Sequence, residues 1–263
     1  MSIEPLDPLK ARQEFSRVRH ANPLVHCMTN AVACAFSADL LAAAGASPAM
    51  IPAKEEAPDF ARIASALLIN VGTLTSTDLS AMLLSARAAT YANKAWVLDP
   101  VAAGVSLWRD AMIAKLLLEA PAVIRANPSE VIALSGGEKT AKGVDSSVES
   151  ELAVEHAVSL AKAAHCIVAV TGAVDFITDG VRTLSVQGGH AGAGRIVGTG
   201  CALSALVAAF IAEAPDRLAA AASACALCKL AAEKAGDLRY GSFRTAYLDA
   251  VEAISLEASA CGA

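Results

Sequence analysis

The sequence lacks any uncharged apolar stretch approaching the ~20 residues that a membrane-spanning helix needs. Its longest Ala-rich run, Leu218–Leu230, is too short and too weakly apolar. It also lacks the basic start and apolar centre of a signal peptide, because charged residues are scattered through its N-terminal segment. These absences exclude a membrane partner and predict a cytoplasmic protein.

Clusters of Lys and Arg are missing too, and the net charge is -5. Nucleic acids and anionic membrane surfaces are therefore excluded as partners, which leaves a small molecule. The seven cysteines show no framework spacing, as expected for reduced thiols. Cys225 and Cys228 form a C-x-x-C without a second pair, which predicts a packed helix face rather than a zinc or redox site.

The chain is rich in apolar residues, which occupy 55% of its 263 positions. This is enough to bury the large core of a single domain spanning residues 1–263, with residues 1–20 as an N-terminal helical extension. Short apolar runs alternate with longer periodic ones, which predicts a mostly parallel α/β sheet covered by helices on both faces. The predicted strands are Leu24–Met28, Ala66–Asn70, Trp96–Leu98, Val123–Arg125 and Ile167–Thr171, and the predicted helices are Ala33–Ala44, Leu79–Tyr91, Arg109–Glu119 and Glu151–Ala164.

A hairpin is expected next, with strands Asp175–Thr178 and Val181–Val186 joined through Asp179-Gly180. Beyond Ile211 the chain is expected to be helical, with breaks near Pro215 and Gly241-Ser242.

The run Gly198-Thr199-Gly200-Cys201 stands directly before an unbroken small and apolar segment, Ala202–Ile211, which predicts a buried helix. Glycines let the backbone approach a ligand closely, and the first N–H groups of a helix are free to bind an anion. The pattern predicts an anion site with a thiol at its mouth. A tight turn with a buried, inert cysteine is the alternative.

Polar residues recur where the predicted strands end, the edge at which open α/β sheets bind ligands. They are Thr29-Asn30, Asn70, Asp99, Asn127 with Glu130, and Thr171-Gly172. Alone, each is a turn or a cap, and Asn127 or Ser129 suits a helix N-cap. Together they are the groups that hold phosphates and a hard divalent cation, so the residues predict a phosphate-handling enzyme.

Strings in a fixed order then resemble the hydroxyethylthiazole kinase family, from about Asn22 to Glu257. They are Asn22–Asn30, Gly45–Met50, Leu68–Leu74, Asp99–Val101, Arg125 with Asn127 and Ser129-Glu130, Gly143–Asp145, Val170–Gly172, Val197–Cys201 and Gly241–Phe243. The resemblance implies a ribokinase-like fold and a homotrimer with active sites between subunits. It also implies transfer of phosphate from ATP, with Mg²⁺, to the primary alcohol of 4-methyl-5-(2-hydroxyethyl)thiazole in thiamine salvage.

The resemblance assigns roles position by position. Met50, Gly198 and Asn30 match thiazole-binding positions; Arg125, Thr171 and Asn127 match nucleotide-binding positions; Asp99 and Glu130 resemble the pair that holds magnesium, directly or through water. The backbone N–H groups of Gly198, Thr199, Gly200 and Cys201 would form the anion hole. Cys201 stands where related kinases carry Asp. As a thiolate acidified by the helix N-terminus it is one candidate acceptor for the proton of the alcohol. The alternative is that proton removal comes late in a loose transition state and needs no strong base.

The chain departs from the family pattern at Ala126, Pro128, Ala173 and Arg195. Ala173 stands where the family usually has Glu beside the nucleotide site. Asp175 lies on the same strand face but ~6–7 Å further on, so it does not simply substitute.

Other interpretations stay open. A kinase for another alcohol, such as hydroxymethylpyrimidine, or an ATP-dependent dehydratase would keep the anion loop but normally carry Asp in place of Cys201. A ligand-binding module without turnover would need no magnesium pair. Gly136–Thr140 only superficially resembles a Walker loop, because Glu138 stands where Gly is needed, and is expected to be a solvated turn. His26 fits the family string or a hydrogen-bonded core histidine.

Overall fold

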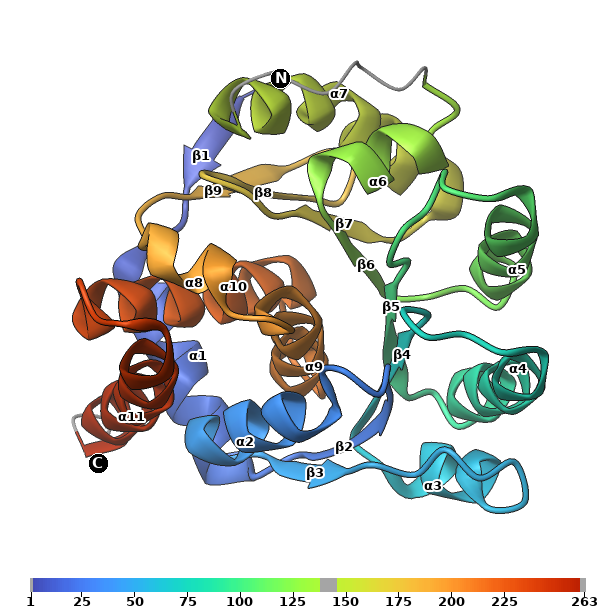
Figure 1. The fold of residues 1–263 in the computed structure, drawn as a ribbon, viewed down its shortest axis with the longest axis horizontal. Helices are drawn as coiled ribbons and strands as arrows, with labels where there is room; N and C mark the ends of the chain where they lie inside the picture. The colour runs from blue at the N-terminus through green and yellow to red at the C-terminus, as the bar shows by residue number, and fades with distance from the viewer. Residues whose placement is uncertain (1, 138–145, 261–263) are drawn as a thin grey trace.

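The computed structural model describes residues 2–137 and 146–260, which build a sheet of nine strands between two layers of helices (Figure 1). The strand order is β1-β9-β8-β7-β6-β5-β4-β2-β3, and β8 alone runs antiparallel to its neighbours. The strands are β1 (Ile3–Pro5), β2 (Leu24–Met28), β3 (Ser47–Ala49), β4 (Ala66–Asn70), β5 (Ala95–Asp99), β6 (Val123–Ala126), β7 (Ile167–Val170), β8 (Asp175–Thr178) and β9 (Thr183–Val186). The mostly parallel α/β architecture expected from the sequence is confirmed.

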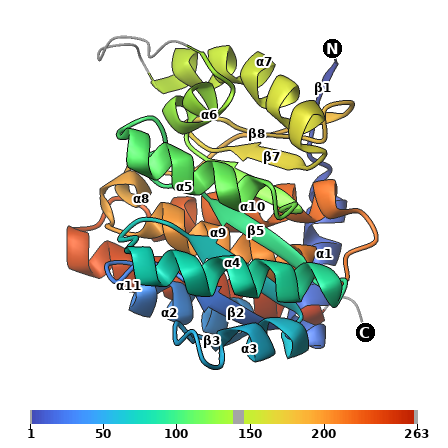
Figure 2. The ribbon, with the colours of Figure 1, turned by 90° about the vertical axis from the view of Figure 1, so that its right-hand side faces the viewer.

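One helical layer holds α1 (Pro8–Ala21), α2 (Cys34–Ala44), α8 (Ala191–Arg195), α9 (Thr199–Ile211), α10 (Arg217–Ala235) and α11 (Tyr240–Ala260). The other holds α3 (Ala57–Ile63), α4 (Ser76–Tyr91), α5 (Leu107–Leu117), α6 (Pro128–Leu134) and α7 (Ser146–Ala164), and this layer faces the viewer in Figure 2. Among the described residues, no helix is both long and apolar enough to cross a membrane.

The central strands are buried on both faces, and alternate residues serve the two layers. Ala66 and Leu68 of β4 belong to the core under α9, whereas Leu67 and Ile69 belong to the core under α4. This is why these strands read as continuous apolar runs. They hold the polar residues at their carboxyl ends on a rigid base.

Helix α9 is the most buried of the described helices, since all ten residues from Ala202 to Ile211 are below one-tenth exposed. It packs against β4 and β5 on one side and against α2 and α10 on the others. Small side chains allow such close packing, and the predicted buried helix is confirmed. Its N-terminus is therefore fixed at the edge of the sheet where the strands end.

Several elements escaped the sequence analysis. The exposed three-residue β1 pairs in parallel with β9 at one sheet edge, and β3, which contains Pro48, forms the other edge. Proline is tolerated at an edge because the missing donor faces no partner strand. Both strands are too short for an alternating pattern. The expected N-terminal helix is α1, which packs on α10 and α11.

The expected break at Gly241-Ser242 is wrong, because both residues lie inside the first turn of α11. The first turn tolerates glycine, since its N–H groups have no partner within the helix. The break falls instead at Gly236, whose positive φ of +64° favours glycine and which ends α10. The break near Pro215 is confirmed. The second hairpin strand begins at Thr183 rather than Val181, which lies in the turn.

Candidate active site

The ends of five parallel strands and the N-terminus of α9 meet at one edge of the sheet. Asn70 and Asp99 are the last residues of β4 and β5, paired side by side in register. Asn30 follows β2, Arg125 lies in β6, and Thr171 follows β7. The structure thus brings together the residues that the sequence placed at strand ends.

A continuous hydrogen-bonded chain crosses this edge. The Asn30 amide donates to Asn70 Oδ1 at 2.9 Å and to the Cys201 sulfur at 3.2 Å. The Asn70 amide donates in turn to Asp99 Oδ2 at 2.6 Å, and Ser204 Oγ donates to the same oxygen at 2.8 Å. The thiol at the head of α9 is therefore linked through two amides to the carboxylate at the end of β5.

Asp99 keeps one oxygen outside this chain. Its Oδ1 is buried and has no hydrogen-bond partner among the described residues. Burial raises the pKa of Asp99 to about 6, against the opposing positive charge of Arg125, and the nearby charge of Glu130 raises it further. An inaccessible carboxylate oxygen without a donor suits a cation, which would lower that pKa again.

Arg125 packs directly against the anion loop. An added Cβ at Gly200 would lie only 2.8 Å from its guanidinium Nη1, so glycine lets the guanidinium rest against the loop backbone. Its guanidinium also donates to Thr171 Oγ1, while its Nε is buried without a partner among the described residues. A guanidinium beside the positive end of a helix repels it unless an anion lies between them. The arrangement therefore favours a bound anion.

Gly198 shapes the loop itself. It is the N-cap of α9 and has a left-handed backbone (φ +88°), and an added Cβ would lie 3.1 Å from the Cβ of Ala33. The positive φ favours glycine, and a larger residue would also need Ala33 to shift by a few tenths of an ångström. In the first turn of α9, the N–H of Thr199 makes a long 3.4 Å bond to the Ile196 carbonyl, and the N–H groups of Gly200 and Cys201 have no partner within the helix and are available to an anion.

Cys201 differs from the expectation of an acidified thiol. Burial raises its pKa above the ordinary value, and the charge of Asp99 raises it further, which outweighs the hydrogen bonds from Asn70 and Asn30. This direction of the pKa is opposite to the acidification that the helix N-terminus alone would produce. A raised pKa favours the thiol form of the sulfur, which accepts a hydrogen bond from Asn30.

Glu130 and Asn127 form a capping box at the start of α6. Asn127 Oδ1 accepts from the Glu130 N–H, and Glu130 Oε2 accepts from the Asn127 N–H, each at 2.9 Å. Glu130 Oε1 accepts from the N–H of Ala102 at 2.8 Å. The N-cap interpretation of Asn127 is confirmed, and both oxygens of Glu130 already bind backbone N–H groups. Within the described residues, no three His, Cys, Asp or Glu side chains gather as a metal cluster.

A cavity of about 600 Å³ opens on the β7–β9 side of the α9 N-terminus. Arg125, Thr171, Thr199 and Gly200 line it, together with residues of the 172–175 and 188–194 segments and of α10. The sulfur of Cys201 instead faces Asn30, on the β2 side. The head of α9 therefore separates two regions. A larger cavity of about 720 Å³, between α1, α10 and α11, has none of these residues in its lining.

Met50 lies just past the carboxyl end of β3, half-buried and packed on the core that includes α2. His26 is a buried core histidine whose Nε2 bonds to the Ile51 carbonyl at 2.8 Å. Burial lowers its pKa. The motif Gly143–Asp145 and most of the expected turn at Gly136–Thr140 lie outside the described residues.

Cys225 and Cys228 are buried on α10 as free thiols, as expected for a packed helix face. Ser204 and Lys229 were not anticipated. Ser204 is the lone hydroxyl within the apolar segment Ala202–Ile211, and Lys229 is the lone charge within the run Leu218–Leu230. A polar residue isolated in an otherwise apolar helix was the available indication in both cases.

Comparison with known proteins defines the class first. A ribokinase-like superfamily protein from Enterococcus faecalis V583 superposes with a TM-score of 0.67 at 14% identity, covering 98% of this chain and 92% of that one. The fold is therefore ribokinase-like.

The family follows from sequence. The family model described as "Hydroxyethylthiazole kinase family" matches residues 15–257. A hydroxyethylthiazole kinase of Tolumonas auensis is 50% identical over 239 residues, which cover 89% of this chain and 90% of the relative. The structure of a hydroxyethylthiazole kinase from Pyrococcus horikoshii OT3 has a TM-score of 0.85 at 37% identity, covering 92% of each chain. The chain belongs to the hydroxyethylthiazole kinase family, and it phosphorylates the alcohol of the thiazole in thiamine salvage.

Proposed function

We propose that ATP occupies the 600 Å³ cavity and that its terminal phosphoryl group passes across the head of α9 to the thiazole alcohol on the Asn30 side. The guanidinium of Arg125 packed on Gly200 is the observation that carries this proposal, because it concentrates positive charge where the two regions meet. Thr171 and Asn127 complete the nucleotide-binding set, Thr171 from the cavity wall and Asn127 from the adjacent cap of α6.

Phosphoryl transfer depends mainly on positioning and on stabilising charge. Arg125 and the backbone N–H groups of Gly198, Thr199, Gly200 and Cys201 take up the charge that develops on the transferring group. Because the glycines fix these donors before substrate binds, no reorganisation is needed during the reaction.

Asp99 and Glu130 fit a magnesium ion in different ways. Asp99 offers the buried Oδ1 that lacks a donor, which suits a hard cation. Both oxygens of Glu130 already accept backbone N–H groups, so Glu130 acts through water and through its charge. A bound Mg²⁺ supplies charge neutralisation to the phosphates.

On the acceptor side, Asn30, Met50 and Gly198 bind the thiazole. Cys201 contacts the alcohol as a protonated thiol. Since proton removal comes late in a loose transition state, the thiol orients the hydroxyl and is not needed as a strong base.

We also infer a cytoplasmic homotrimer of single-domain chains, with active sites between subunits and no nucleic-acid partner. Exposed apolar side chains beside the site support an interface there. Val32, Val197 and Tyr240 are 65%, 59% and 47% exposed, and the Tyr240 hydroxyl accepts from the Val197 N–H at 3.3 Å. Light scattering after size-exclusion chromatography tests this, and a monomeric mass would contradict it.

The function is tested by coupled assay of ADP release with ATP and Mg²⁺. The acceptors are the thiazole, hydroxymethylpyrimidine and none. Turnover with the thiazole, lost by ~10²-fold in Arg125→Met, is expected from removal of one transition-state donor. Turnover with hydroxymethylpyrimidine instead would favour the other kinase of this fold. Binding of the thiazole without ADP release from any acceptor would favour a binding module.

A further inference from the structure

We propose that Lys229 of α10 is a positioning residue that holds the two walls of the nucleotide pocket together. This inference rests on the proposed function, in which the 600 Å³ cavity takes ATP. One wall follows β7 and consists of residues 171–175, and the other follows β9 and consists of residues 188–190.

The ammonium group of Lys229 binds both walls at once. It donates to the carbonyls of Gly172 and Ala173 at 3.2 and 2.9 Å, and to the carbonyl of Gly188 at 3.3 Å. An ammonium group has three donors, and these three carbonyls together with Asp175 Oδ1 at 3.5 Å surround it. Its side chain is only 11% exposed. Lys229 therefore acts through the backbone of the pocket and not by binding a phosphate itself.

Asp175 keeps this charge in place. Its side chain is 5% exposed, and its Oδ1 lies 3.5 Å from the Lys229 ammonium while accepting from the Gly172 N–H at 2.9 Å. A buried lysine needs such a counter-charge. The β7 wall is thus bound through carbonyls by the lysine and through an N–H group by the aspartate.

Glu233 lies one turn further along α10 and binds the β9 wall in the opposite sense. Its Oε1 accepts from the N–H of Gly189 at 2.8 Å, next to the Gly188 carbonyl that Lys229 binds. Gly188 and Gly189 both have left-handed backbones, with φ of +93° and +95°. An added Cβ at Gly188 would collide with the Glu233 carboxylate. The β9 wall therefore packs directly against α10 through Glu233. Lys229 is the residue that hydrogen-bonds to both walls and so joins them.

This arrangement also accounts for Ala173, where the family usually has Glu. Lys229 binds the main-chain carbonyl of Ala173, which any residue supplies. The position of the wall is thus set by Lys229 and does not require a carboxylate at position 173.

The test compares Lys229→Met with Lys234→Met, a control on the same helix whose ammonium pairs with Glu257 at the surface. For Lys229→Met we expect the KM for ATP and the Kd for ADP, measured by calorimetry, to rise ~tenfold, the effect of losing hydrogen bonds to a charged group. The KM for the thiazole stays within ~twofold, because the acceptor region is bounded by other strands. Equal rises in both KM values would overturn the proposal.

The double variant Lys229→Met/Asp175→Asn guards against a folding defect, because it removes the buried charge that the single variant leaves unpaired. If the weaker nucleotide binding persists in this variant, the tie between the walls is supported. If binding returns to the wild-type value, Lys229 serves only as a counter-charge, and the proposal fails. Arg125→Met distinguishes failure of the Lys229 proposal from failure of the assignment of the cavity to ATP. If ADP binds weakly to Arg125→Met but normally to Lys229→Met, only the role of Lys229 is overturned. If ADP binds normally to both variants, the assignment of the cavity to ATP is overturned as well.

Discussion

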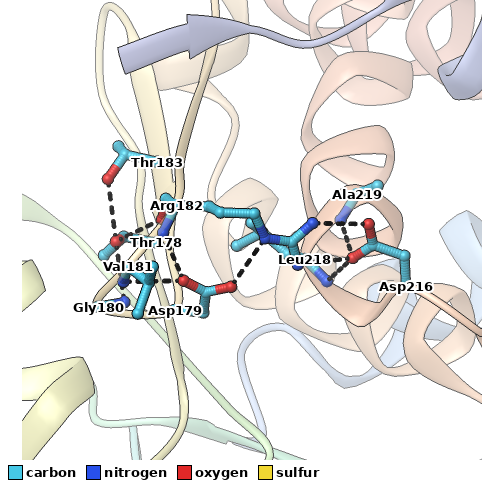
Figure 3. A network of polar contacts seen from close by, with 9 residues as sticks. All are labelled: Thr178, Asp179, Gly180, Val181, Arg182, Thr183, Asp216, Leu218 and Ala219. Carbon is cyan, nitrogen blue, oxygen red and sulfur yellow. Dashed lines mark hydrogen bonds and ion pairs between the residues drawn. The ribbon is translucent and has the colours of Figure 1, made fainter. Parts of the chain in front are cut away.

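The two ends of the sheet treat polar groups in opposite ways. At the turn between β8 and β9, Arg182 pairs with Asp179 and Asp216 at 3.1 and 3.0 Å (Figure 3). Asp179 also accepts from the N–H groups of Val181 and Arg182, and Asp216 caps α10. At the carboxyl ends of the strands, by contrast, Asp99 Oδ1 and Arg125 Nε are buried without partners among the described residues.

The carboxylate pKa values reflect this contrast. Hydrogen bonds from Arg182 lower the pKa of Asp216, and at Asp179 partial burial is outweighed by backbone and side-chain donors, so that its pKa is lowered as well. Burial raises the pKa of Asp99 and of Asp175 to about 6. One end therefore stabilises the fold, and the other holds charges at a cost in stability because ligands will meet them.

The sharpest test of this contrast is Asp99→Asn. We expect kcat/KM to fall by ~10³-fold, because the buried charge that suits the cation is lost. We expect the melting temperature to stay equal or to rise, since the amide oxygen can still accept from Asn70 and Ser204 without a buried charge. Both quantities are measured on the same preparation, by activity assay and by thermal melting. A large loss of stability would show that Asp99 has a structural role.

The next prediction concerns pH. Because the folded pKa of Asp175 is raised to about 6 from an unfolded value near 3.8, the folded state binds its proton more tightly. Stability is therefore lost as the pH rises between these values, by up to ~3 kcal/mol. Urea unfolding at pH 4.5 and 7 should show a smaller loss in Asp175→Asn than in the wild type. An equal loss of stability in both proteins would show that titration of Asp175 does not cause it.

At the end of the sheet that carries the β8–β9 turn, we expect a smaller effect, which falls on stability and not on activity. Asp216→Ala removes the N-cap of α10, whose oxygen accepts from Leu218 and Ala219, and should cost ~1 kcal/mol of unfolding free energy. Its kcat and both KM values should not change at 25 °C. Changed kinetics with an unchanged melting temperature would contradict the division between the two ends.

The same division explains what the sequence could predict. The buried strands, α9 and the polar strand ends follow from local patterns. Each strand is a run of apolar residues that ends in polar ones, and α9 is a run of small and apolar residues that follows a glycine-rich loop. The edge strands β1 and β3 could not be predicted, because each depends on pairing with a distant partner over three residues. The chain from Cys201 through Asn30 and Asn70 to Asp99 is likewise a product of register between β2, β4 and β5.

The environment of Cys201 could not be predicted from the sequence for a related physical reason. A helix N-terminus lowers a thiol pKa, but burial and the neighbouring Asp99 act in the other direction, and neither is visible locally. The sequence shows what lies next to a residue along the chain, and the pKa depends on what surrounds it in space.

We expect the smallest effect on activity from substitution of Cys201. If a protonated thiol only orients the alcohol, Cys201→Ala should keep activity within ~tenfold of wild type, since proton removal in a loose transition state contributes little. The effect should fall on the KM for the thiazole more than on the KM for ATP, because the sulfur faces Asn30 and not the nucleotide cavity. The thiol should also react slowly with iodoacetamide at pH 7. A loss of activity comparable to that of Asp99→Asn, with rapid alkylation, would instead make Cys201 an active thiolate and place the proton acceptor on α9.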